Sequence, residues 1–485
     1  MKKLLVSILF IALIFSVTAV PASAEDTVIP YTNFTYSEAD GSIVESPQAY
    51  IPQTTVYGKD LGIGDFLYPS DFDTDTNGDI YILDAGNGRV VVIDTNLQYK
   101  SHFDCIINDE KIDISTAQGI TVTQDSVYIC DTDHSRILVF NKADGIFKYE
   151  IGTPTAVALD DNFLFKPAKV SVDTHGDLYV VSNGTYEGIL NLRPDGEFVT
   201  FFAANKVSTD AWDLFWRNFS TKKQRKARVA LIPQDFSSID IDANGFLMIT
   251  TFTAVNDSMV KRANPGGTNV IRTLSNSKIN GNKIDSSFSD ITAGPDRLYS
   301  CLDRKNGKIY TYNNDGYLLY TFGAKAAQQG GFKNPTAITY LDDYRIAALD
   351  IDRASITVFK TTEYADTIHL ANKYQTNLEY DKATEQWERV LEYNSNFSLA
   401  IKMIGIRHFE AGEYQLAKKY FKLCNAKDMY SDARQELRSE WIYNNSWIIM
   451  TVVLVLAGFY LYVRIKESVK KRKEKQRAKQ QMRSR

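Results

Sequence analysis

An acidic stretch near the start of the chain has the residue types and spacing of a calcium-binding loop. In DTDTNGDIYILD, Asp73, Asp75 and Asn77 stand at the first, third and fifth positions of an EF-hand loop, and Gly78 and Asp84 stand at the sixth and twelfth. Their oxygen atoms are the ligand type that Ca²⁺ prefers. An EF-hand also needs a helix on each side of the loop, so the flanking elements must decide between a calcium site and a turn.

Other residues that often do chemistry are few. The chain has 5 His and 4 Cys. No His lies in a nucleophile-elbow context, and no Ser-His-Asp arrangement is indicated. The wide spacing of Cys105, Cys130, Cys301 and Cys424 fits neither a zinc knuckle nor a disulfide scaffold, which favours buried free thiols. A Cys105–Cys130 disulfide stays open as the alternative, and the sequence leans against an enzyme without excluding one.

A repeated segment organises most of the chain. Each copy reads as three strands of alternating apolar residues joined by tight turns, and the copies are mostly spaced by roughly 47 to 52 residues. That period, with several strands in each unit, predicts a β-propeller. The copies begin at Pro69, Ala117, Pro167, Phe236, Ser289 and Pro335, and we align Asp84, Asp131, Ser182, Thr250, Leu302 and Asp350 as equivalent residues.

The repeat changes the interpretation of the acidic stretch. Its flanks, FDTD and IYIL, are predicted strands, and the same turn recurs at His175-Gly176 and Asn244-Gly245 without the full set of carboxylates. We therefore predict a hairpin turn and no cofactor. Calcium, or another divalent metal, at this one acidic turn stays the alternative, because a turn can bind an ion without helices.

The segments LDAGNGRVVVID and CDTDHSRILVF resemble the NHL repeat, which carries an Asp, an Asn or His three places on, and an Arg before the third strand. The last copy keeps Asp350 but has Arg353 and Ser355, and the third and fourth copies lack the pattern. The resemblance covers residues 41 to 362 approximately and implies a six-bladed propeller in a family that mostly binds other molecules. The matching positions, expected to tie strand turns together, are Asp84, Asn87, Arg89, Asp131, His134 and Arg136.

Six copies predict six blades within residues 41–364. The last copy shows three strands before Tyr364, while an additional strand, AYIPQTTVYG, precedes the first copy. We expect this strand to complete the last blade and close the ring, which leaves no free sheet edge at the junction.

The resemblance also suggests where a ligand would bind. Six-bladed propellers of the gluconolactonase type hold a divalent metal at the channel mouth with Glu, Asn and Asp from the innermost strands. The mouth positions here are Asp71, Gly119, Lys169, Ser238, Asp290 and Ala337, preceded by Ser70, Gln118, Ala168, Ser237, Ser289 and Thr336.

Two carboxylates and a lysine suit a metal poorly, since Lys169 would repel a dication. Lys169 could instead pair with either aspartate or recognise an anionic ligand. We therefore expect no catalytic and no metal-binding residue. The candidate ligand-binding residues are Asp71, Gln118, Lys169, Ser238 and Asp290.

An insertion over residues 207–230 interrupts the repeat and is predicted to be helical. Trp212, Phe215, Trp216 and Phe219 share one helical face, expected to pack on the blades, with an open ligand platform as the alternative. A basic cluster follows that could contact anions or lipid headgroups, or could simply form a solvated helix face. Its members are Lys222, Lys223, Arg225, Lys226 and Arg228.

Residues 366–440 show a helical pattern with a second repeat. Tyr380, Ala383 and Trp387 recur 34 residues later as Tyr414, Ala417 and Phe421, which is the tetratricopeptide period. The resemblance to tetratricopeptide repeats implies a pair of helical hairpins that binds a protein partner; a rigid spacer is the alternative. Two repeats bury little core, so this segment is expected to lean on the propeller or on a partner.

The two ends of the chain carry membrane-targeting signals. Residues 1–24 read as a signal peptide ending in Ala22-Ser23-Ala24, and residues 25–40 as a linker. Residues 447–463 carry no charge and would form a helix about 25 Å long at ~1.5 Å per residue, enough to cross a bilayer. The basic tail, residues 464–485, is then cytoplasmic by the positive-inside rule.

Charge separates the parts of the chain. Removing the +9 of the tail and the +2 of Lys2 and Lys3 from the formal charge of −4 leaves about −15 on the part between, which argues against nucleic-acid binding there. The tail itself could contact lipid headgroups, a cytoplasmic partner or nucleic acid.

We conclude that the sequence describes a mainly β protein, a six-bladed NHL-type propeller followed by a tetratricopeptide-like hairpin pair and one transmembrane helix. We expect a single-pass type I protein of a bacterial cell membrane that binds a protein partner, with a small-molecule or glycan ligand as a further option, and that serves as an accessory to a transporter or envelope complex. The alternative function is a membrane-tethered, metal-dependent lactonase-like hydrolase.

Overall fold

The computed structural model describes most of the chain. The described residues are 29–37, 42–157, 159, 163–203, 236–255, 258–271, 278–279, 282–283, 286–341 and 344–483. The predicted signal peptide (1–24), the helical insertion (207–230) with its aromatic face, and the basic cluster within that insertion lie outside them.

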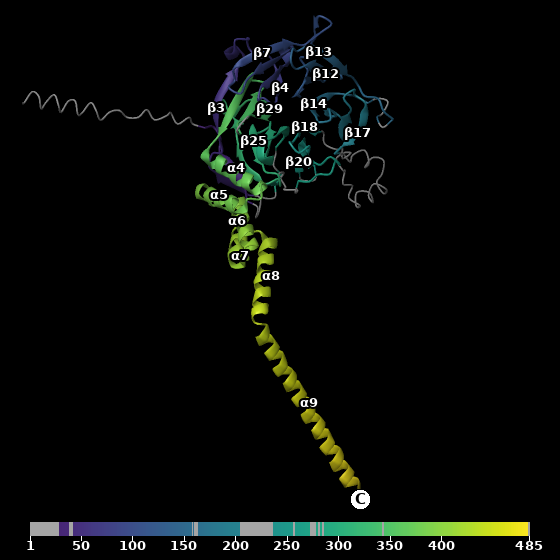
Figure 1. Cartoon of the computed structure of the whole chain (residues 1–485), viewed down its shortest axis with the longest axis vertical. Helices are drawn as coiled ribbons and strands as arrows, with labels where there is room; N and C mark the ends of the chain where they lie inside the picture. The colour runs from purple at the N-terminus through teal and green to yellow at the C-terminus, as the bar shows by residue number, and fades with distance from the viewer. Residues whose placement is uncertain are drawn as a thin grey trace, which may run out of the picture. The chain divides into compact units, whose positions relative to one another are not determined.

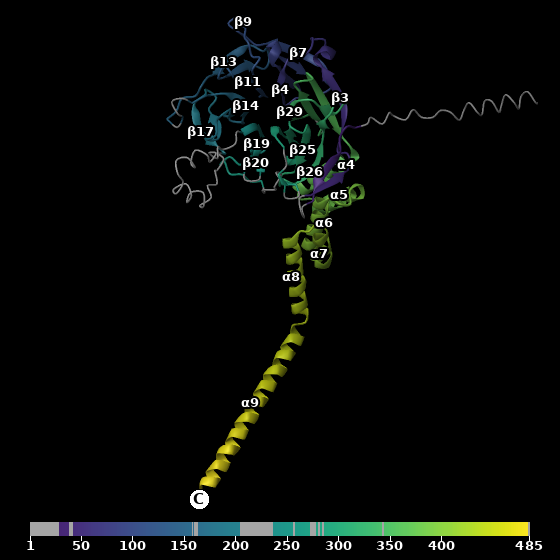
Figure 2. The same cartoon turned by 180° about the vertical axis from the view of Figure 1, so that it is seen from behind.

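Six antiparallel sheets follow one another along the chain as the blades of a β-propeller, which confirms the predicted fold (Figures 1 and 2). Contacts between neighbouring innermost strands run from β4 through β10, β14, β18, β23 and β29 back to β4, so the ring is closed. Blade one is β4 (Pro69–Thr74), β5 (Ile80–Asp84), β6 (Arg89–Ile93) and β7 (Tyr99–Asp104); blade two is β10 (Gly119–Val122), β11 (Ser126–Asp131), β12 (Arg136–Asn141) and β13 (Phe147–Ile151); blade three is β14 (Pro167–Val172), β15 (Leu178–Ser182), β16 (Ile189–Leu192) and β17 (Phe198–Phe202).

The other three blades continue the order. Blade four is β18 (Phe236–Ile241), β19 (Leu247–Val255) and β20 (Ser258–Ala263); blade five is β23 (Phe288–Ala293), β24 (Tyr299–Asp303), β25 (Lys308–Tyr312) and β26 (Leu318–Phe322); blade six is β29 (Pro335–Tyr340), β30 (Ile346–Asp350), β31 (Ser355–Thr361) and β3 (Tyr50–Tyr57). Short pieces between them are β1 (Asn33–Tyr36), β2 (Ile43–Ser46), β8 (Ile106–Ile107), β9 (Glu110–Lys111), β21 (Lys278–Ile279), β22 (Asn282–Lys283), β27 (Ala324–Lys325), β28 (Gly331–Phe332) and the 3₁₀ turns η1 (Gly58–Leu61), η2 (Ala85–Asn87) and η3 (Pro295–Arg297).

The ring closes as the sequence predicts. Strand β3 pairs antiparallel with β31, from Tyr50 opposite Thr361 to Tyr57 opposite Ser355. An N-terminal strand thus completes the last C-terminal blade, and unfolding either end must break this pairing. Strand β1 lies within the range predicted as a linker; its Phe34 N–H donates to Thr321 Oγ1 of blade five at 3.2 Å.

The core lies between adjacent blades because successive strand residues face opposite sides of a sheet. Leu83 and Val90 of blade one share a buried cluster with blade two, whereas their neighbours Ile82 and Val91 pack with Leu349 of blade six. Blade one therefore supplies one apolar face to blade two and the other to blade six.

The acidic turn of blade one is a hairpin between β4 and β5, as predicted. The Asp75 carboxylate accepts hydrogen bonds from the backbone N–H groups of Asn77 at 2.8 Å and Asp79 at 2.9 Å, and it pairs with Lys142 Nζ at 2.7 Å. Burial opposes ionisation of Asp75, but the hydrogen bonds from Lys142 and the two N–H groups lower its pKa overall. Its charge therefore stabilises the turn.

The NHL-type residues tie the second strand of a blade to its turns, also as predicted. Asp84 accepts hydrogen bonds from the Leu67 N–H at 2.7 Å, Asn87 Nδ2 at 2.8 Å and Arg89 Nε at 2.7 Å. In blade two, Asp131 contacts His134 Nδ1 at 2.8 Å and Arg136 Nε at 2.9 Å.

The predicted equivalence is wrong by one residue in blades four and five. Pro69 pairs with Asp84, and by the same register Phe236 pairs with Thr251 and Phe288 with Asp303, so Thr250 and Leu302 are not the equivalent residues. Two adjacent threonines concealed the slip in blade four. In blade five the turn lacks the Asn-Gly or His-Gly pair that anchored the alignment. Asp303 accepts a hydrogen bond from Asn306 Nδ2 at 2.7 Å, so blade five also keeps the Asp and Asn pattern.

Helix α4 (Glu363–Thr376) belongs to the same compact unit as the blades, which extends to Leu378. The His369 imidazole is fully buried; it hydrogen-bonds with the Tyr320 hydroxyl and stacks on the Tyr344 ring, with centroids 4.3 Å apart. Asn372 Nδ2 donates to the Asp296 carbonyl at 3.1 Å. The helical unit therefore begins after Leu378 rather than at residue 366, and the segment predicted to lean on the propeller does so through α4.

The second unit consists of helices with small and aromatic residues at their contacts. In α5 and α7, Ala383, Trp387, Ala417 and Phe421 are at most 2% exposed. A side chain at Gly405 would meet the Phe421 ring at 2.8 Å, so a glycine permits the close approach of α6 and α7. The tetratricopeptide resemblance stays a prediction. The helices are α5 (Tyr380–Tyr393), α6 (Ser398–Glu410), α7 (Tyr414–Leu423), α8 (Lys427–Asn444) and α9 (Ser446–Arg483).

Helix α9 includes a segment that is long and apolar enough to cross a membrane, by length and composition. All four cysteines lie among the described residues, and each is a buried free thiol, so the alternative Cys105–Cys130 disulfide is not formed.

Candidate functional site

The innermost strands of the six blades direct alternate side chains into a central channel. A bulge follows the first residue of five of these strands, between Pro69 and Asp71 in blade one and at the matching place in blades three to six. The bulge sets the register so that equivalent residues form rings around the channel. We call the first ring the lysine ring; its members are Asp71, Gly119, Lys169, Ser238, Asp290 and Ala337.

Lys169 lies between two carboxylates of the lysine ring. Its Nζ is 2.6 Å from Asp71 Oδ1 and 3.1 Å from Asp290 Oδ1, and Ser238 Oγ donates to Asp290 Oδ1 at 2.7 Å. The other oxygens of the two carboxylates accept backbone N–H groups of the next blade, from Ile120 at 2.9 Å and Ile338 at 2.8 Å. One buried ammonium thus links blades one, three and five.

The pKa directions follow from burial and from charge imbalance. Burial alone would lower the pKa of Lys169, but the carboxylates of Asp290 and Asp71 raise it above its ordinary value, so Lys169 stays protonated. Burial raises the pKa of Asp71 to about 7 against the opposing effect of Lys169, and the charge of Asp290 adds to the rise. Asp71 and Asp290 share one cation, so ionising one carboxylate when the other is already charged costs free energy.

The small members of the lysine ring leave room for this arrangement. A Cβ on Gly119 would lie 2.4 Å from the Ala168 carbonyl, so only glycine lets blade two approach blade three here. Ala337 contributes only a methyl group on blade six.

Four of the five residues predicted to bind a ligand meet in this ring: Asp71, Lys169, Ser238 and Asp290. The fifth, Gln118, is exposed one residue before it, where its Oε1 accepts a hydrogen bond from Asn183 Nδ2 at 3.1 Å. Lys169 pairs with both aspartates rather than with one of them.

A second ring lies two residues farther along each innermost strand. We call it the hydroxyl ring; its residues are not among the predicted site residues, although the two-residue period of a strand predicts it. Its members are Asp73, Thr121, Ser171, Asp240, Thr292 and Thr339.

Asp71, Lys169 and Asp290 of the lysine ring and all six residues of the hydroxyl ring line one cavity of about 230 Å³. The lining extends from the lysine ring to the last residues of the innermost strands, including Thr74, Val122, Val172 and Ile241. The cavity therefore lies on the side of the turns that follow these strands, away from Gln118.

The two carboxylates of the hydroxyl ring are held by backbone N–H groups. Asp73 Oδ2 accepts from Val122 at 2.8 Å, and Asp240 Oδ2 accepts from Ala293 at 2.7 Å. Burial raises the pKa of Asp73 to about 7 and that of Asp240 to about 6, because these hydrogen bonds only partly offset the loss of solvation.

The lysine ring does not suit the divalent metal that the gluconolactonase resemblance implies. A protonated lysine already lies within 3.1 Å of both carboxylates and would repel a dication. Among the residues that the structure describes, no three or more His, Cys, Asp or Glu side chains are grouped so as to hold a metal ion.

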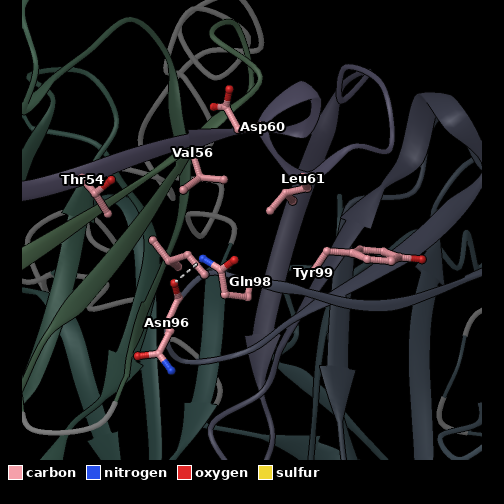
Figure 3. A pocket seen from close by; sticks show the side chains of 8 residues that line it. Thr54, Val56, Asp60, Leu61, Asn96, Gln98 and Tyr99 are labelled. Atoms are coloured by element: carbon pink, nitrogen blue, oxygen red, sulfur yellow. Dashed lines mark hydrogen bonds between the residues drawn. The ribbon is translucent and has the colours of Figure 1, made fainter.

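A second cavity, of about 330 Å³, lies where the ring closes between β3 of blade six and the β6–β7 turn of blade one. Figure 3 shows Gln98 hydrogen-bonded to Asn96, with the Tyr99 ring directed away from them. This second cavity is lined by Thr54, Val56, Asp60, Leu61, Asn96, Leu97, Gln98 and Tyr99.

Comparison with known proteins supports the repeat. The model of the NHL repeat matches residues 66–93, which include β4, β5 and β6. No curated protein matches the sequence.

Several solved structures are similar at low identity. A streptogramin B lyase is 13% identical over 61% of this chain and 94% of that chain, with a TM-score of 0.40. A catalytically inactive virginiamycin B lyase from Staphylococcus aureus, with quinupristin, is 13% identical over 67% and 86%, with a TM-score of 0.40. A protein of unknown function from Bacteroides thetaiotaomicron is 14% identical over 68% and 76%, with a TM-score of 0.42. At these values no activity is inferred from the similarity.

Proposed function

We propose that this chain is a single-pass membrane protein that displays an NHL-type propeller and a helical unit outside the cytoplasm and uses them for binding. The observation that carries the proposal is α9. Side chains such as Leu454, Leu456 and Phe459 are between 61% and 67% exposed on a helix whose apolar segment is followed directly by a basic one. Covering so much apolar surface with lipid is strongly favourable.

The channel argues against metal-dependent hydrolysis. Hydrolysis of the gluconolactonase type would require the carboxylates at this level to hold a metal, whereas Lys169 engages both Asp71 and Asp290. The ion pairs of Lys169 with Asp71 and Asp290 join three blades, which is a structural role.

The helical unit is the proposed protein-binding part. Its residues spaced by the tetratricopeptide period are buried alike, Ala383 with Ala417 and Trp387 with Phe421, as expected if successive hairpins pack in the same way. A protein that extracts stoichiometrically with the full chain should be lost when residues 379–440 are deleted, a boundary that leaves α4 on the propeller. If the full chain is always extracted from the membrane without another protein, the proposed protein-binding role of the helical unit is wrong.

Membrane retention tests the anchor. We expect the full chain to stay in the membrane pellet after an alkaline carbonate wash, and a chain that ends at Asn445 to appear in the soluble fraction. A chain that ends at Val463 keeps the apolar segment without the basic tail and should stay in the pellet, which separates insertion from electrostatic attachment.

Release of the full chain by carbonate would contradict the anchor. If the full chain is retained but the chain that ends at Val463 is released, then the tail, not the apolar segment, holds the protein at the membrane. Retention of the chain that ends at Asn445 would transfer the anchor to the N-terminal apolar run.

A further inference from the structure

The two rings of the channel repeat one pattern with one difference. In the lysine ring, two carboxylates contact an ammonium group, that of Lys169, at 2.6 Å from Asp71 and 3.1 Å from Asp290, and the Ser238 hydroxyl donates to Asp290. In the hydroxyl ring, Asp73 and Asp240 again supply two carboxylates, and hydroxyl groups line the space beside them. The ring has no lysine or arginine of its own.

The carboxylates of the hydroxyl ring lack a cationic partner. Across the described part of the chain, no Lys, Arg or His side chain forms an ion pair with Asp73 or Asp240; each carboxylate accepts only backbone N–H groups. Four carboxylates, Asp71, Asp73, Asp240 and Asp290, therefore line a cavity that contains a single lysine. When these carboxylates are ionised, the excess of negative charge in the cavity attracts a cation.

A threonine hydroxyl without a partner also lines the cavity. Thr292 is 4% exposed and stands two residues after Asp290 on the same face of β23, so that its side chain lines the channel. Its hydroxyl forms no hydrogen bond with any residue in the described ranges and stays accessible from the cavity, free to bond with a ligand there. A hydrogen-bonding ligand in the cavity would satisfy it.

The cavity limits the size of that ligand and the side from which it enters. Its volume of about 230 Å³ is below that of pockets for drug-sized ligands, which begin at about 300 Å³. Because the lining reaches Thr74, Val122 and Ile241 at the ends of the innermost strands, a ligand enters from the turns that follow them.

We propose that the hydroxyl ring binds a small organic cation through primary ammonium groups, which Asp73 and Asp240 each accept, with Thr292 as a further acceptor. The two aspartates stand on blades one and four, which oppose each other in a ring of six, so a short linear diamine would place one ammonium at each. The inference rests on the proposed binding role of the propeller and does not depend on the membrane anchor.

An ammonium fits this ring better than a metal ion does. The channel already holds one ammonium, that of Lys169, between two carboxylates. Among the described residues, three or more His, Cys, Asp or Glu side chains never lie close enough together to hold a metal ion. An ammonium donates hydrogen bonds in several directions and can use carboxylate and hydroxyl acceptors together.

Binding should strengthen with pH. Burial raises the pKa of Asp73 to about 7 and of Asp240 to about 6, with the charges of Asp71, Asp290 and Lys169 facing them in the cavity. Both aspartates are largely protonated at pH 5 and ionised at pH 8, whereas a primary ammonium keeps its charge over this range. We expect the dissociation constant to fall by about tenfold or more between pH 5 and pH 8.

The test uses the full chain in detergent with 1,4-diaminobutane as the probe, followed by calorimetry and thermal unfolding at pH 8. Asp73→Asn and Asp240→Asn keep an oxygen acceptor for the Val122 and Ala293 N–H groups and should each weaken binding by about tenfold. Thr292→Val should weaken it by about threefold. Asp125→Asn, an exposed residue in the turn after β10, removes the same charge from the same face and should change nothing.

Each result decides for or against the ring. The proposal is wrong if the folded protein binds neither 1,4-diaminobutane nor 1-aminobutane. It is also wrong if the neutral butane-1,4-diol binds as tightly as the diamine. A preference for Ca²⁺ or Mg²⁺ that Asp240→Asn abolishes would assign the ring to a metal. Binding unaffected by both Asn variants would place the amine elsewhere. Loss of membrane retention would leave all these results unchanged, so the two proposals fail independently.

Discussion

Replacing Lys169 with methionine should lower the free energy of unfolding of the propeller by about 3–5 kcal/mol. The substitution leaves Asp71 and Asp290 buried without their shared cation, and an uncompensated buried charge is destabilising by this amount. Thermal unfolding of the full chain measures the global effect. Hydrogen exchange at the N–H groups of Ile120 and Ile338, which donate to the two carboxylates, reports the local one.

A matched control and a pH series make this result specific. Lys100→Met removes an exposed ion pair with Asp79 and should cost at most about 1 kcal/mol. Without Lys169 the two carboxylates hold protons in the folded state that the unfolded state releases above pH 4, so the deficit should shrink as the pH falls from 8 to 5. The double variant with Asp71→Asn should recover part of the loss. If Lys169→Met lowers the free energy of unfolding no more than Lys100→Met does, then the ion pairs of Lys169 with Asp71 and Asp290 do not stabilise the channel.

Replacing Trp387 with alanine should destabilise the helical unit by about 3–5 kcal/mol, because the indole is 1% exposed and stacks on Phe397 with ring centroids 6.2 Å apart. Hydrogen exchange over α5 and α6 should rise by several orders of magnitude, while the innermost strands of the propeller stay protected. Any protein that extracts with the chain through this unit should be lost at the same time.

Trp441→Ala provides the control, since that side chain is 61% exposed on α8 and should tolerate removal within about 0.5 kcal/mol. Phe421→Ala, at the position 34 residues after Trp387, should resemble Trp387→Ala if the two hairpins pack alike. Equal protection of α5 in the Trp387 and Trp441 variants would contradict the assigned core.

The repeat allows most of the propeller to be predicted from the sequence. Strand period and turn residues suffice to place Asp71, Lys169 and Asp290 in one ring, because each innermost strand starts with the same apolar and small pattern. Where a turn lacks its Asn-Gly signal, as before Asp303, the alignment slips by one residue. Predicting the hydroxyl ring requires only extending each strand by two positions.

Other features depend on contacts between distant residues, which local patterns do not report. The docking of α4 depends on His369 meeting Tyr320 and Tyr344, residues that lie in other elements. The simultaneous pairing of Lys169 with two aspartates depends on how the closed ring brings blades one, three and five together.

The most direct test of the central claim is the side of the membrane on which each unit lies. Glu197→Cys places a thiol on an exposed turn of blade three, and Lys475→Cys places one in the basic part of α9; the four native thiols are buried and give little background. With an impermeant maleimide we expect Glu197→Cys to be labelled only in right-side-out vesicles and Lys475→Cys only in inside-out ones. Labelling of both positions from the same side would contradict a single-pass protein with its propeller outside the cytoplasm.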